Sequence, residues 1–232
     1  VAKVGEKVKA GSVLMIDKNR PEIKFVSPVS GEVTAVNRGE KRKVLSIVVK
    51  PDAQIEYEEF GKKNVASLQG AEVKEVLLNA GMWPFIKQRP YDIVAAPLDT
   101  PRDIFVSAFY SAPLAPNFDF IVKGQEADFQ TGLNALAKLT NGKVYVGVRS
   151  GSVVSGMKGV EIVEVEGPHP AANVGVQINH IKPVNKGEVV WTVNPADVIV
   201  IGRLFNKGVA DFSRMVAITG SETTERGYVK TI

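Results

Sequence analysis

The segment Gly-Pro-His-Pro-Ala-Ala-Asn at residues 167–173 holds residue types suited to binding a polar ligand. It directly follows an expected strand, Glu161–Val165, and open α/β sheets bind ligands beyond the carboxyl ends of their strands. Two prolines hold the imidazole of His169 on a stiff loop, where it could bond to a quinone carbonyl or a phosphate. The candidate ligand-binding residues of this loop are Gly167, Pro168, His169, Pro170 and Asn173. The structural alternative is that His169 fixes its own loop by bonding to a neighbouring backbone carbonyl.

A second candidate lies at residues 81–92, where the sequence reads GMWPFIKQRPYD. Trp83, Phe85 and Tyr91 surround Lys87 and Arg89 in this segment. Aromatic rings beside a guanidinium group are suited to stacking on a flat ring system. We therefore add Trp83 and Arg89 to the candidate quinone-binding residues, with an ordinary core edge as the alternative.

The composition excludes several kinds of reactive centre. The chain of 232 residues has no cysteine, which excludes disulfides, thiolate zinc sites, cysteine-ligated iron–sulfur clusters and cysteine nucleophiles. It has no glycine-rich dinucleotide motif, no P-loop, no G-x-S-x-G and no H-E-x-x-H. Its carboxylates are scattered, without a spacing that indicates an acid–base pair. We therefore predict no catalytic residue and no metal site in this chain.

The net charge is mildly basic, at +4 with an isoelectric point near 9.1. That excess is too small to indicate a nucleic-acid-binding protein. A basic cluster does surround Gly39, formed by Arg38, Lys41, Arg42 and Lys43. Such a cluster is suited to docking on an acidic partner or on anionic lipid heads, although a basic cluster of this kind is more often a solvated turn. Apolar runs such as Val198–Ile201 are far shorter than the ~20 residues of a membrane-spanning helix.

Residues 1–50 are typical of a small all-β module, with Val, Ile and Phe between glycine-containing turns. The turns are expected at Gly5, Gly11, Gly31 and Gly39. The spacing of Val and Gly from Val1 to Leu14, with the later turn Ser27–Gly31, resembles the biotinyl and lipoyl domains. A barrel-sandwich hybrid is therefore the expected fold of this module.

Biotinyl and lipoyl domains carry their prosthetic group on a lysine at the tip of a hairpin. In this chain the tip reads Asn19-Arg20-Pro21, with Lys18 and Lys24 on either side. Neither lysine lies in the E-x-x-K or M-K-M setting of a modified residue. We therefore interpret the hairpin as structural, and the alternative is a biotin or lipoate carrier.

Residues 51–232 are typical of an α/β domain with a Rossmann-like sheet. Helical spacing of apolar residues predicts helices at Ala66–Ala80 and Glu126–Leu139, followed by Gly81 and Gly142 as caps. Strands are expected at Ile93–Ala96, Ile104–Ala108, Lys143–Val148, Glu161–Val165, Val189–Val193, Val198–Ile201 and Val216–Thr219. The last part of the domain, about residues 183–232, is expected to be rich in β-structure.

Five blocks of sequence, spread over nearly the whole chain, resemble one known family. They are RGEKR (38–42), GMWPFIKQRPYD (81–92), the block from Pro101 to Ala115, GPHPAANVG (167–175) and VVWTVNPADVIVIGRLFNKG (189–208). The blocks are long and irregular in composition, so chance agreement is far less expected than for one short motif. The chain is similar to the NqrA family, one of the subunits of the sodium-translocating NADH:quinone reductase.

The resemblance implies a place in a bacterial respiratory pump that passes electrons from NADH to ubiquinone and exports sodium. This chain would then be a peripheral subunit on the cytoplasmic face of the inner membrane, with the membrane-embedded subunits among its partners. The FAD, FMN, riboflavin and iron–sulfur centre of the complex would belong to other subunits, and this chain would bind none of them. Its own role would be mainly structural and docking, with ubiquinone binding through the GPHPAANVG loop as the alternative.

The family is itself distantly similar to the flavin- and NADH-binding subunit of complex I, whose Rossmann-like domain holds FMN with a glycine-rich loop. Here the bulky residues Met82, Trp83 and Pro84 follow Gly81. A tryptophan and a proline would obstruct the approach of a phosphate to the backbone, so we expect no FMN or NADH site. Family members continue into a β-grasp-type domain after these residues, so we interpret the chain as a fragment.

Overall fold

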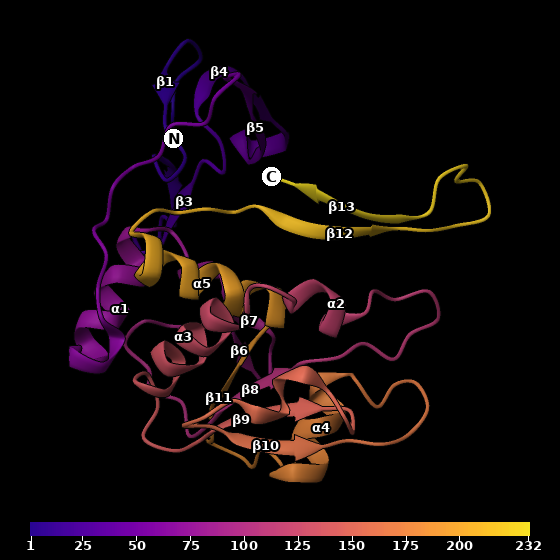
Figure 1. The fold of residues 1–232 in the computed structure, drawn as a ribbon. Coiled ribbons are helices and arrows are strands. Elements are labelled where there is room, and N and C mark those ends of the chain that lie inside the picture. The colour runs from indigo at the N-terminus through magenta and orange to yellow at the C-terminus, as the bar shows by residue number, and fades with distance from the viewer.

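The computed structural model describes residues 1–232 and contains a β module followed by a larger α/β domain, which confirms the expected fold class (Figure 1). The module comprises β1 (Lys7–Val8), β2 (Val13–Ile16), β3 (Lys24–Val26), β4 (Gly31–Arg38), the 3-10 turn η1 (Glu40–Arg42) and β5 (Val44–Pro51). Strands β1, β4 and β5 form one antiparallel sheet, and β2 pairs with β3 in a second. Its small buried core consists of Val8, Leu14 and Val33.

The connector between the two domains is paired with both of them. Tyr57 forms a β-bridge with Ala10 of the module, and Glu59 forms a second bridge with Val209 of the α/β domain. The Ala10 amide also donates to the Glu56 carbonyl at 2.9 Å. The connector is therefore held by backbone contacts to both domains.

The α/β domain begins with the turn η2 (Val65–Ser67) and the helix α1 (Gly70–Asn79). Its other helices are α2 (Phe118–Val122), α3 (Glu126–Ala137), α4 (Val174–Ile181) and α5 (Pro195–Lys207), with the turns η3 (Trp83–Phe85) and η4 (Val153–Gly156). Its strands are β6 (Ile86–Arg89), β7 (Ile93–Val94), β8 (Ile104–Ser107), β9 (Val144–Val148), β10 (Glu161–Glu164), β11 (Val190–Val193), β12 (Arg214–Ile218) and β13 (Gly227–Thr231). The two expected helices and six of the seven expected strands are confirmed, with ends that differ by a few residues.

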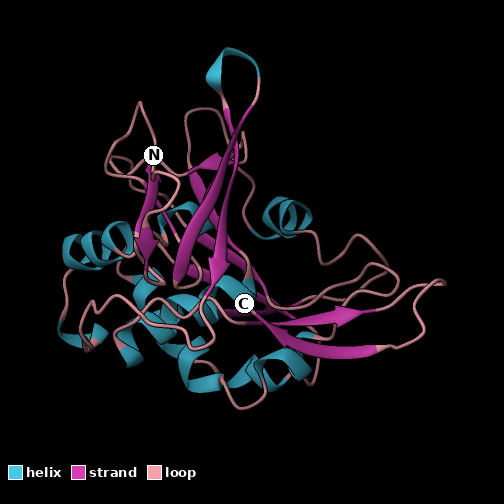
Figure 2. Ribbon diagram, turned by 90° about the horizontal axis from the view of Figure 1, so that it is seen from above, coloured by secondary structure: helices cyan, strands magenta, loops and turns pink.

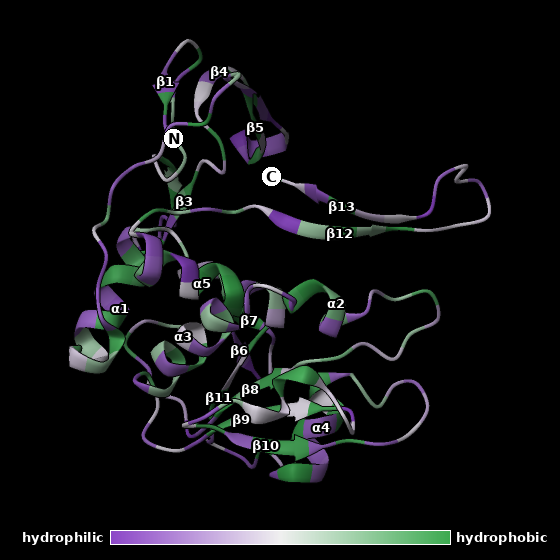
Figure 3. Ribbon diagram, in the orientation of Figure 1, coloured by the Kyte–Doolittle hydropathy of each residue, from purple (hydrophilic) through white to green (hydrophobic).

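Six strands form the central sheet in the order β10-β9-β8-β11-β6-β7. Strand β8 is parallel to both β9 and β11, β10 is parallel to β9, and β6 and β7 run antiparallel. The chain leaves β8 toward β9 on one side and returns at β11 on the other, so a topological switch point lies between β8 and β11. All four residues of β8 are buried, and the strand is hydrophobic in Figure 3.

Helices cover both faces of this sheet. Because side chains alternate along a strand, Val106 of β8 packs in the main core with α3 and α5, and Phe105 packs with Ile178 of α4. Helices α3 and α5 approach each other at two glycines. A Cβ added to Gly202 would lie 1.7 Å from the Asp128 carbonyl oxygen, so the two helices touch at the backbone.

Helix α5 shows that the expected strand at Val198–Ile201 was wrong. Asn194 caps the helix by accepting a hydrogen bond from the Ala196 amide at 3.0 Å, and Pro195 occupies the first turn. Four β-branched residues in a row are typical of a strand, but α5 is buried on nearly all sides and is therefore apolar around its circumference. Residues 183–232 thus contain a 13-residue helix between their strands, and this part is not β-rich throughout.

The β12–β13 hairpin extends away from the domain as a two-stranded arm (Figures 1 and 2). The hydroxyl of Tyr228 accepts a hydrogen bond from the Asn117 amide at 2.7 Å, just before α2. The ring of Tyr228 also lies 4.3 Å from that of Phe120. These contacts attach one side of the arm to α2.

Candidate functional site

A crevice of about 420 Å³ lies at the switch point, beyond the carboxyl ends of β8 and β11. Ser107 lines it from the end of β8, and Asn194 lines it just after β11. Strand β6 contributes the cations Lys87 and Arg89, since alternate residues of a strand point to the same side. The aromatic lining residues are Phe85, Phe109 and Tyr110. The crevice therefore combines ring faces with cationic donors where α/β sheets bind their ligands.

Helix α5 begins at this crevice, and its first turn carries an internal carboxylate, Asp197. The Arg214 guanidinium lies 2.6 Å from that carboxylate and 5.3 Å from the centroid of the Phe85 ring. Burial raises the pKa of Asp197, although the charges of Arg214 and Lys87 act in the opposite direction. A phosphate at this helix start would meet a carboxylate already in place, so the residues present do not fit a phosphate-bearing flavin or nucleotide.

Arg89 lies between the crevice and the first turn of α4. Its Nε is 3.4 Å from the Asp92 carboxylate, and its Nη1 would lie 3.9 Å from a Cβ added to Gly175. The Nε is shielded from solvent and has no hydrogen-bond partner within the chain. Because this Nε is buried beside Asp92, donor capacity toward a ligand in the crevice rests with the terminal amino groups of Arg89.

The proposed stacking role of Trp83 is wrong, because this side chain has no exposed surface. Its indole Nε1 donates to the Ala95 carbonyl at 2.8 Å, and its ring packs edge-on against Trp191 at a centroid distance of 5.4 Å. Trp83 is thus part of the core, as in the core-edge alternative. Its neighbours Pro84 and Phe85 do line the crevice.

The residues Gly167–Pro170 line a different cavity, a groove of about 640 Å³ between β10 and α4. The Nδ1 atom of His169 lies 3.1 Å from the Ser111 hydroxyl, which itself accepts a hydrogen bond from the Ala172 amide at 3.1 Å. His169 therefore anchors its loop through a hydroxyl group and not through the backbone carbonyl of the structural alternative. The structure separates His169 from Arg89: the first lies in the groove and the second in the crevice.

The start of α4 lies between the crevice and the groove. Asn173 caps the helix by accepting a hydrogen bond from the Gly175 amide at 2.9 Å, which is a structural role. The hydroxyl of Ser107 donates to the Ala172 carbonyl at 2.8 Å and accepts from the buried Gln177 amide group at 2.9 Å. Ser107 and Gln177 were not among the predicted residues, because they are 70 positions apart and carry no local motif.

The tip of the β2–β3 hairpin, where a carrier domain would hold its modified lysine, is fixed to the α/β domain. Nη1 of Arg20 donates to the Val94 carbonyl at 3.0 Å, and Nη2 of the same residue bonds to Asp17 at 3.3 Å. The Lys24 amine is occupied by the Asn79 side chain at 2.7 Å. These contacts favour the structural interpretation of the hairpin over a mobile carrier.

The four basic candidate docking residues lie at the exposed end of the β4–β5 hairpin, where Figure 2 shows η1 at the tip of two long strands. Lys41 and Arg42 have positive φ values of 54° and 61°. Nη1 of Arg38 donates to the Arg42 carbonyl at 3.1 Å, which closes the turn. Together with Lys43 they form a solvent-facing basic group, called the basic tip below.

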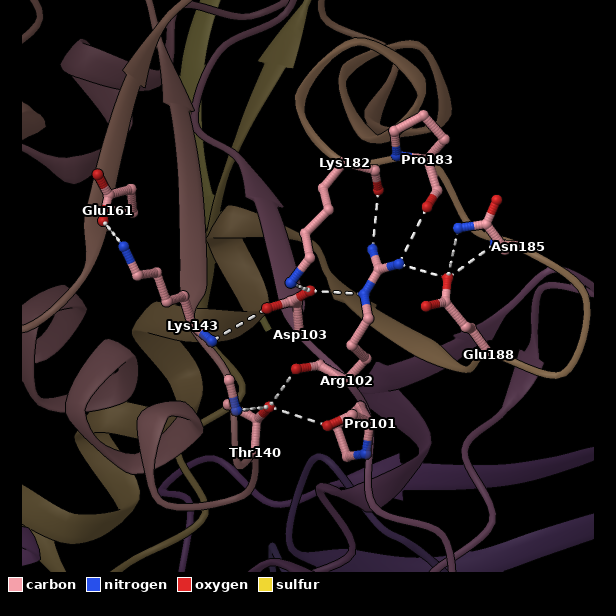
Figure 4. A network of polar contacts seen from close by, with 11 residues as sticks. Pro101, Arg102, Asp103, Thr140, Lys143, Glu161, Lys182, Pro183, Asn185 and Glu188 are labelled. Carbon is pink, nitrogen blue, oxygen red and sulfur yellow. Dashed lines mark hydrogen bonds and ion pairs between the residues drawn. The ribbon is translucent and has the colours of Figure 1, made fainter.

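A buried ionic network lies at the opposite, amino-terminal ends of the strands (Figure 4). The Asp103 carboxylate, 1% exposed, is 2.7 Å from both Arg102 Nε and Lys182 Nζ, and it accepts from the Lys143 amide at 3.1 Å. Burial alone would raise the pKa of Asp103, but the hydrogen bonds from Lys182, Lys143 and Arg102 hold it below its usual value. The network joins the starts of β8 and β9 to the turn after α4, far from the crevice. Its partners are up to 86 positions apart, as in the pair of Arg102 and Glu188, so no sequence pattern indicated it.

No helix of the chain combines the length and the apolar character needed to cross a bilayer. No group of three or more histidine, aspartate or glutamate side chains is arranged to hold a metal ion.

Comparison with known proteins identifies the family. Residues 1–52 match the NqrA N-terminal barrel-sandwich hybrid domain, and residues 68–210 match the NqrA second alpha/beta domain. The NqrA subunit of the Na(+)-translocating NADH-quinone reductase is 37% identical in Neisseria meningitidis serogroup A, 38% in Hahella chejuensis and 36% in Photorhabdus laumondii. These matches cover 99%, 99% and 100% of this chain, in the same order. The chain itself spans about half the length of these relatives, at 52%, 52% and 53%. The resemblance is confirmed, and the chain belongs to the NqrA family of Na(+)-translocating NADH-quinone reductase subunits.

Proposed function

We propose that this chain forms the structural and docking part of the NqrA subunit in a reductase that passes electrons from NADH to ubiquinone and exports sodium. One observation carries this role: the Asp197–Arg214 pair occupies the helix start where an α/β domain would hold a cofactor phosphate. FAD, FMN, riboflavin and the iron–sulfur centre then belong to the other subunits. A domain whose cofactor position is filled by its own side chains is suited to act as a scaffold.

The partners in this proposal are the other subunits, including the membrane-embedded ones, and the chain lies on the cytoplasmic face of the bacterial inner membrane. The basic tip supports the docking role, because four cations on a projecting hairpin favour an acidic or anionic surface. It is separate from the crevice, so docking and ligand binding can be tested with different variants.

Reconstitution tests the docking role. A complex assembled without NqrA should lose NADH-to-quinone activity, and full activity in its absence would contradict an essential role. FMN titrated into the purified chain should show no saturable quenching of flavin fluorescence, because Asp197 opposes its phosphate. Saturable quenching would place a flavin on this chain.

A second candidate function is the binding of ubiquinone in the same crevice. A quinone is a neutral flat ring with carbonyl acceptors, so it needs donors and ring faces but no phosphate site. Lys87 and Arg89 supply the donors, and Phe85 and Tyr110 supply the ring faces. His169 opens into the groove and takes no part in this arrangement, which differs from binding through the GPHPAANVG loop.

Chemical shifts of the chain, titrated with a short-chain ubiquinone analogue, test this second function. We expect shifts at Lys87, Arg89 and Tyr110, and a weaker response in Arg89→Ala than in the exposed control Lys186→Ala. Shifts confined to His169 would move the quinone to the groove. An unchanged spectrum would remove the quinone function from this chain.

A further inference from the structure

The central sheet has one closed edge and one open edge. At the closed edge β7 is only two residues long, and its Val94 carbonyl is occupied by Arg20 of the β module. At the other edge β10 pairs with β9 alone. An edge strand presents a row of unpaired backbone donors and acceptors to any segment that can lie beside it. Strand β10 is therefore the only long edge of this sheet that remains available.

The direction of the free backbone groups follows from the pairing with β9. The Val165 amide donates to the Val148 carbonyl at 2.8 Å, directly after the register pair Glu164 and Val148. Backbone groups of successive residues in a strand alternate in direction. The amide and carbonyl groups of Ile162 and Glu164 therefore point away from β9, toward solvent.

The groove of about 640 Å³ runs along this edge, with β10 and the following residues on one side and α4 on the other. Val163 and Val165 line the strand side, and Val176 and Ile181 line the helix side. A groove between an edge strand and a helix is a geometry in which extended peptides add to a sheet. Their backbone would pair with β10, and alternate side chains would enter the groove beside these four apolar residues.

The negative charges along β10 determine which kind of strand can pair with this edge. Glu161, Glu164 and Glu166 lie within six residues, and no lysine or arginine occurs between them. Glu161 is paired with Lys143 at 2.8 Å, whereas Glu164 and Glu166 have no ion-pair partner. A second copy of this edge would place glutamates against glutamates, which is unfavourable. A strand with lysine or arginine at alternate positions is complementary.

We propose that the β10 edge binds an extended, lysine- or arginine-rich segment of another subunit, which adds to the sheet as one more strand. The identity of this partner as a subunit of the reductase rests on the proposed docking role. The binding geometry rests on the edge, the groove and the charges alone, so it can be tested without any other subunit.

The test uses amide hydrogen exchange, measured by NMR on the full chain with an eight-residue peptide that alternates lysine with valine or threonine. We expect exchange at the Ile162 and Glu164 amides to slow roughly tenfold or more at saturation. The Val165 amide, already bonded to β9, should keep its rate. A twin peptide with glutamate in place of lysine should not bind.

A charge-reversal pair supplies the matched control. Glu164→Lys with Glu166→Lys should weaken binding of the lysine peptide roughly tenfold, since attractive charge pairs between facing strands become repulsive ones. The same change in charge at Glu222 and Glu225, in the turn of the β12–β13 arm, should leave the affinity unchanged.

Four results would overturn the proposal. The lysine peptide could bind without slowing the outward amides, which would show non-specific attraction. The lysine and glutamate peptides could bind equally well, or the two charge-reversal variants could weaken binding equally, and either result would remove the role of Glu164 and Glu166. Sedimentation could show a dimer that the Glu164 and Glu166 variant abolishes, which would make a second copy the occupant. None of these results bears on whether the reductase assembles without NqrA, so the docking role is tested separately.

Discussion

The Asp197 carboxylate lies 2.6 Å from the Arg214 guanidinium, so the first turn of α5 is joined to the first residue of β12. The pair fills the position at the switch point that a cofactor phosphate would need. It also attaches the C-terminal arm to the crevice through a charge that is largely shielded from water. Changes at this pair should therefore affect both folding and ligand selection.

The free energy of unfolding should depend on pH through Asp197. Burial raises the pKa of Asp197 in the folded state, so the folded protein favours the protonated carboxyl. The contribution of Asp197 to stability is therefore complete below its unfolded-state pKa of about 3.8, and it is lost as pH rises through the folded-state pKa. Asp197→Asn removes the dependence. The free energy of unfolding of the natural chain minus that of Asp197→Asn, measured by urea unfolding, should therefore decrease as pH rises above about 4. A difference that increases with pH would show that Arg214 dominates over burial.

For Asp103 we expect the opposite pH dependence of the free energy of unfolding. Its folded-state pKa is lowered, so its contribution is present above the unfolded value of about 3.8 and is lost as pH falls through the folded value. Asp103→Asn should reduce the free energy of unfolding by about 2–3 kcal/mol near neutral pH, because Lys182 and Arg102 lose a buried charged acceptor. The loss should become smaller near pH 3. Asp52→Asn, at an exposed position, should change stability by less than about 0.5 kcal/mol at either pH.

The contact between α3 and α5 should not tolerate a methyl group at Gly202. A Cβ there would lie 1.7 Å from the Asp128 carbonyl oxygen, so the helices would have to separate. We expect Gly202→Ala to cost about 3 kcal/mol, near the upper end for overpacking. Gly156→Ala is the control, because no atom lies within 4 Å of its added Cβ. Equal urea midpoints for Gly202→Ala and Gly156→Ala would contradict the close approach of α3 and α5 at Gly202.

The basic tip should contribute to attachment of the full-length NqrA protein. Each cation near an anionic surface contributes about 1 kcal/mol, so replacing all four with glutamine should lower the salt concentration at which NqrA leaves the complex. Size-exclusion chromatography at increasing salt measures this. The control replaces four exposed lysines elsewhere, namely Lys123, Lys158, Lys186 and Lys230. Dissociation of both variants at the same salt concentration would exclude a specific role for the tip.

Local patterns predicted most of the elements but not the long-range pairs. Apolar spacing over Glu126–Leu139 identified α3, and short β-branched runs identified β8 to β11. The same rule failed at Val198–Ile201, because a helix buried on nearly all sides lacks the polar face on which the helical pattern depends. The capping sequence of Asn194, Pro195 and Asp197 was the local signal that could have corrected this.

The candidate site was predicted in part. Arg89 was identified beside aromatic residues, and it does line the crevice. The same pattern included Trp83, since an aromatic side chain gives no local indication of whether it faces a ligand or the core. Asp197 and Arg214 are 17 positions apart, and their contact depends on the path of the chain after α5. Only the folded structure brings such pairs together.

The bridges that Tyr57 and Glu59 make to Ala10 and Val209 have a mechanical consequence. The connector has no slack between these two points, so a force applied to the β4–β5 hairpin reaches the central domain through paired backbone. The β module is thus joined to the α/β domain through paired backbone at both ends of this short connector. A partner that binds the β4–β5 hairpin therefore also constrains the orientation of the α/β domain.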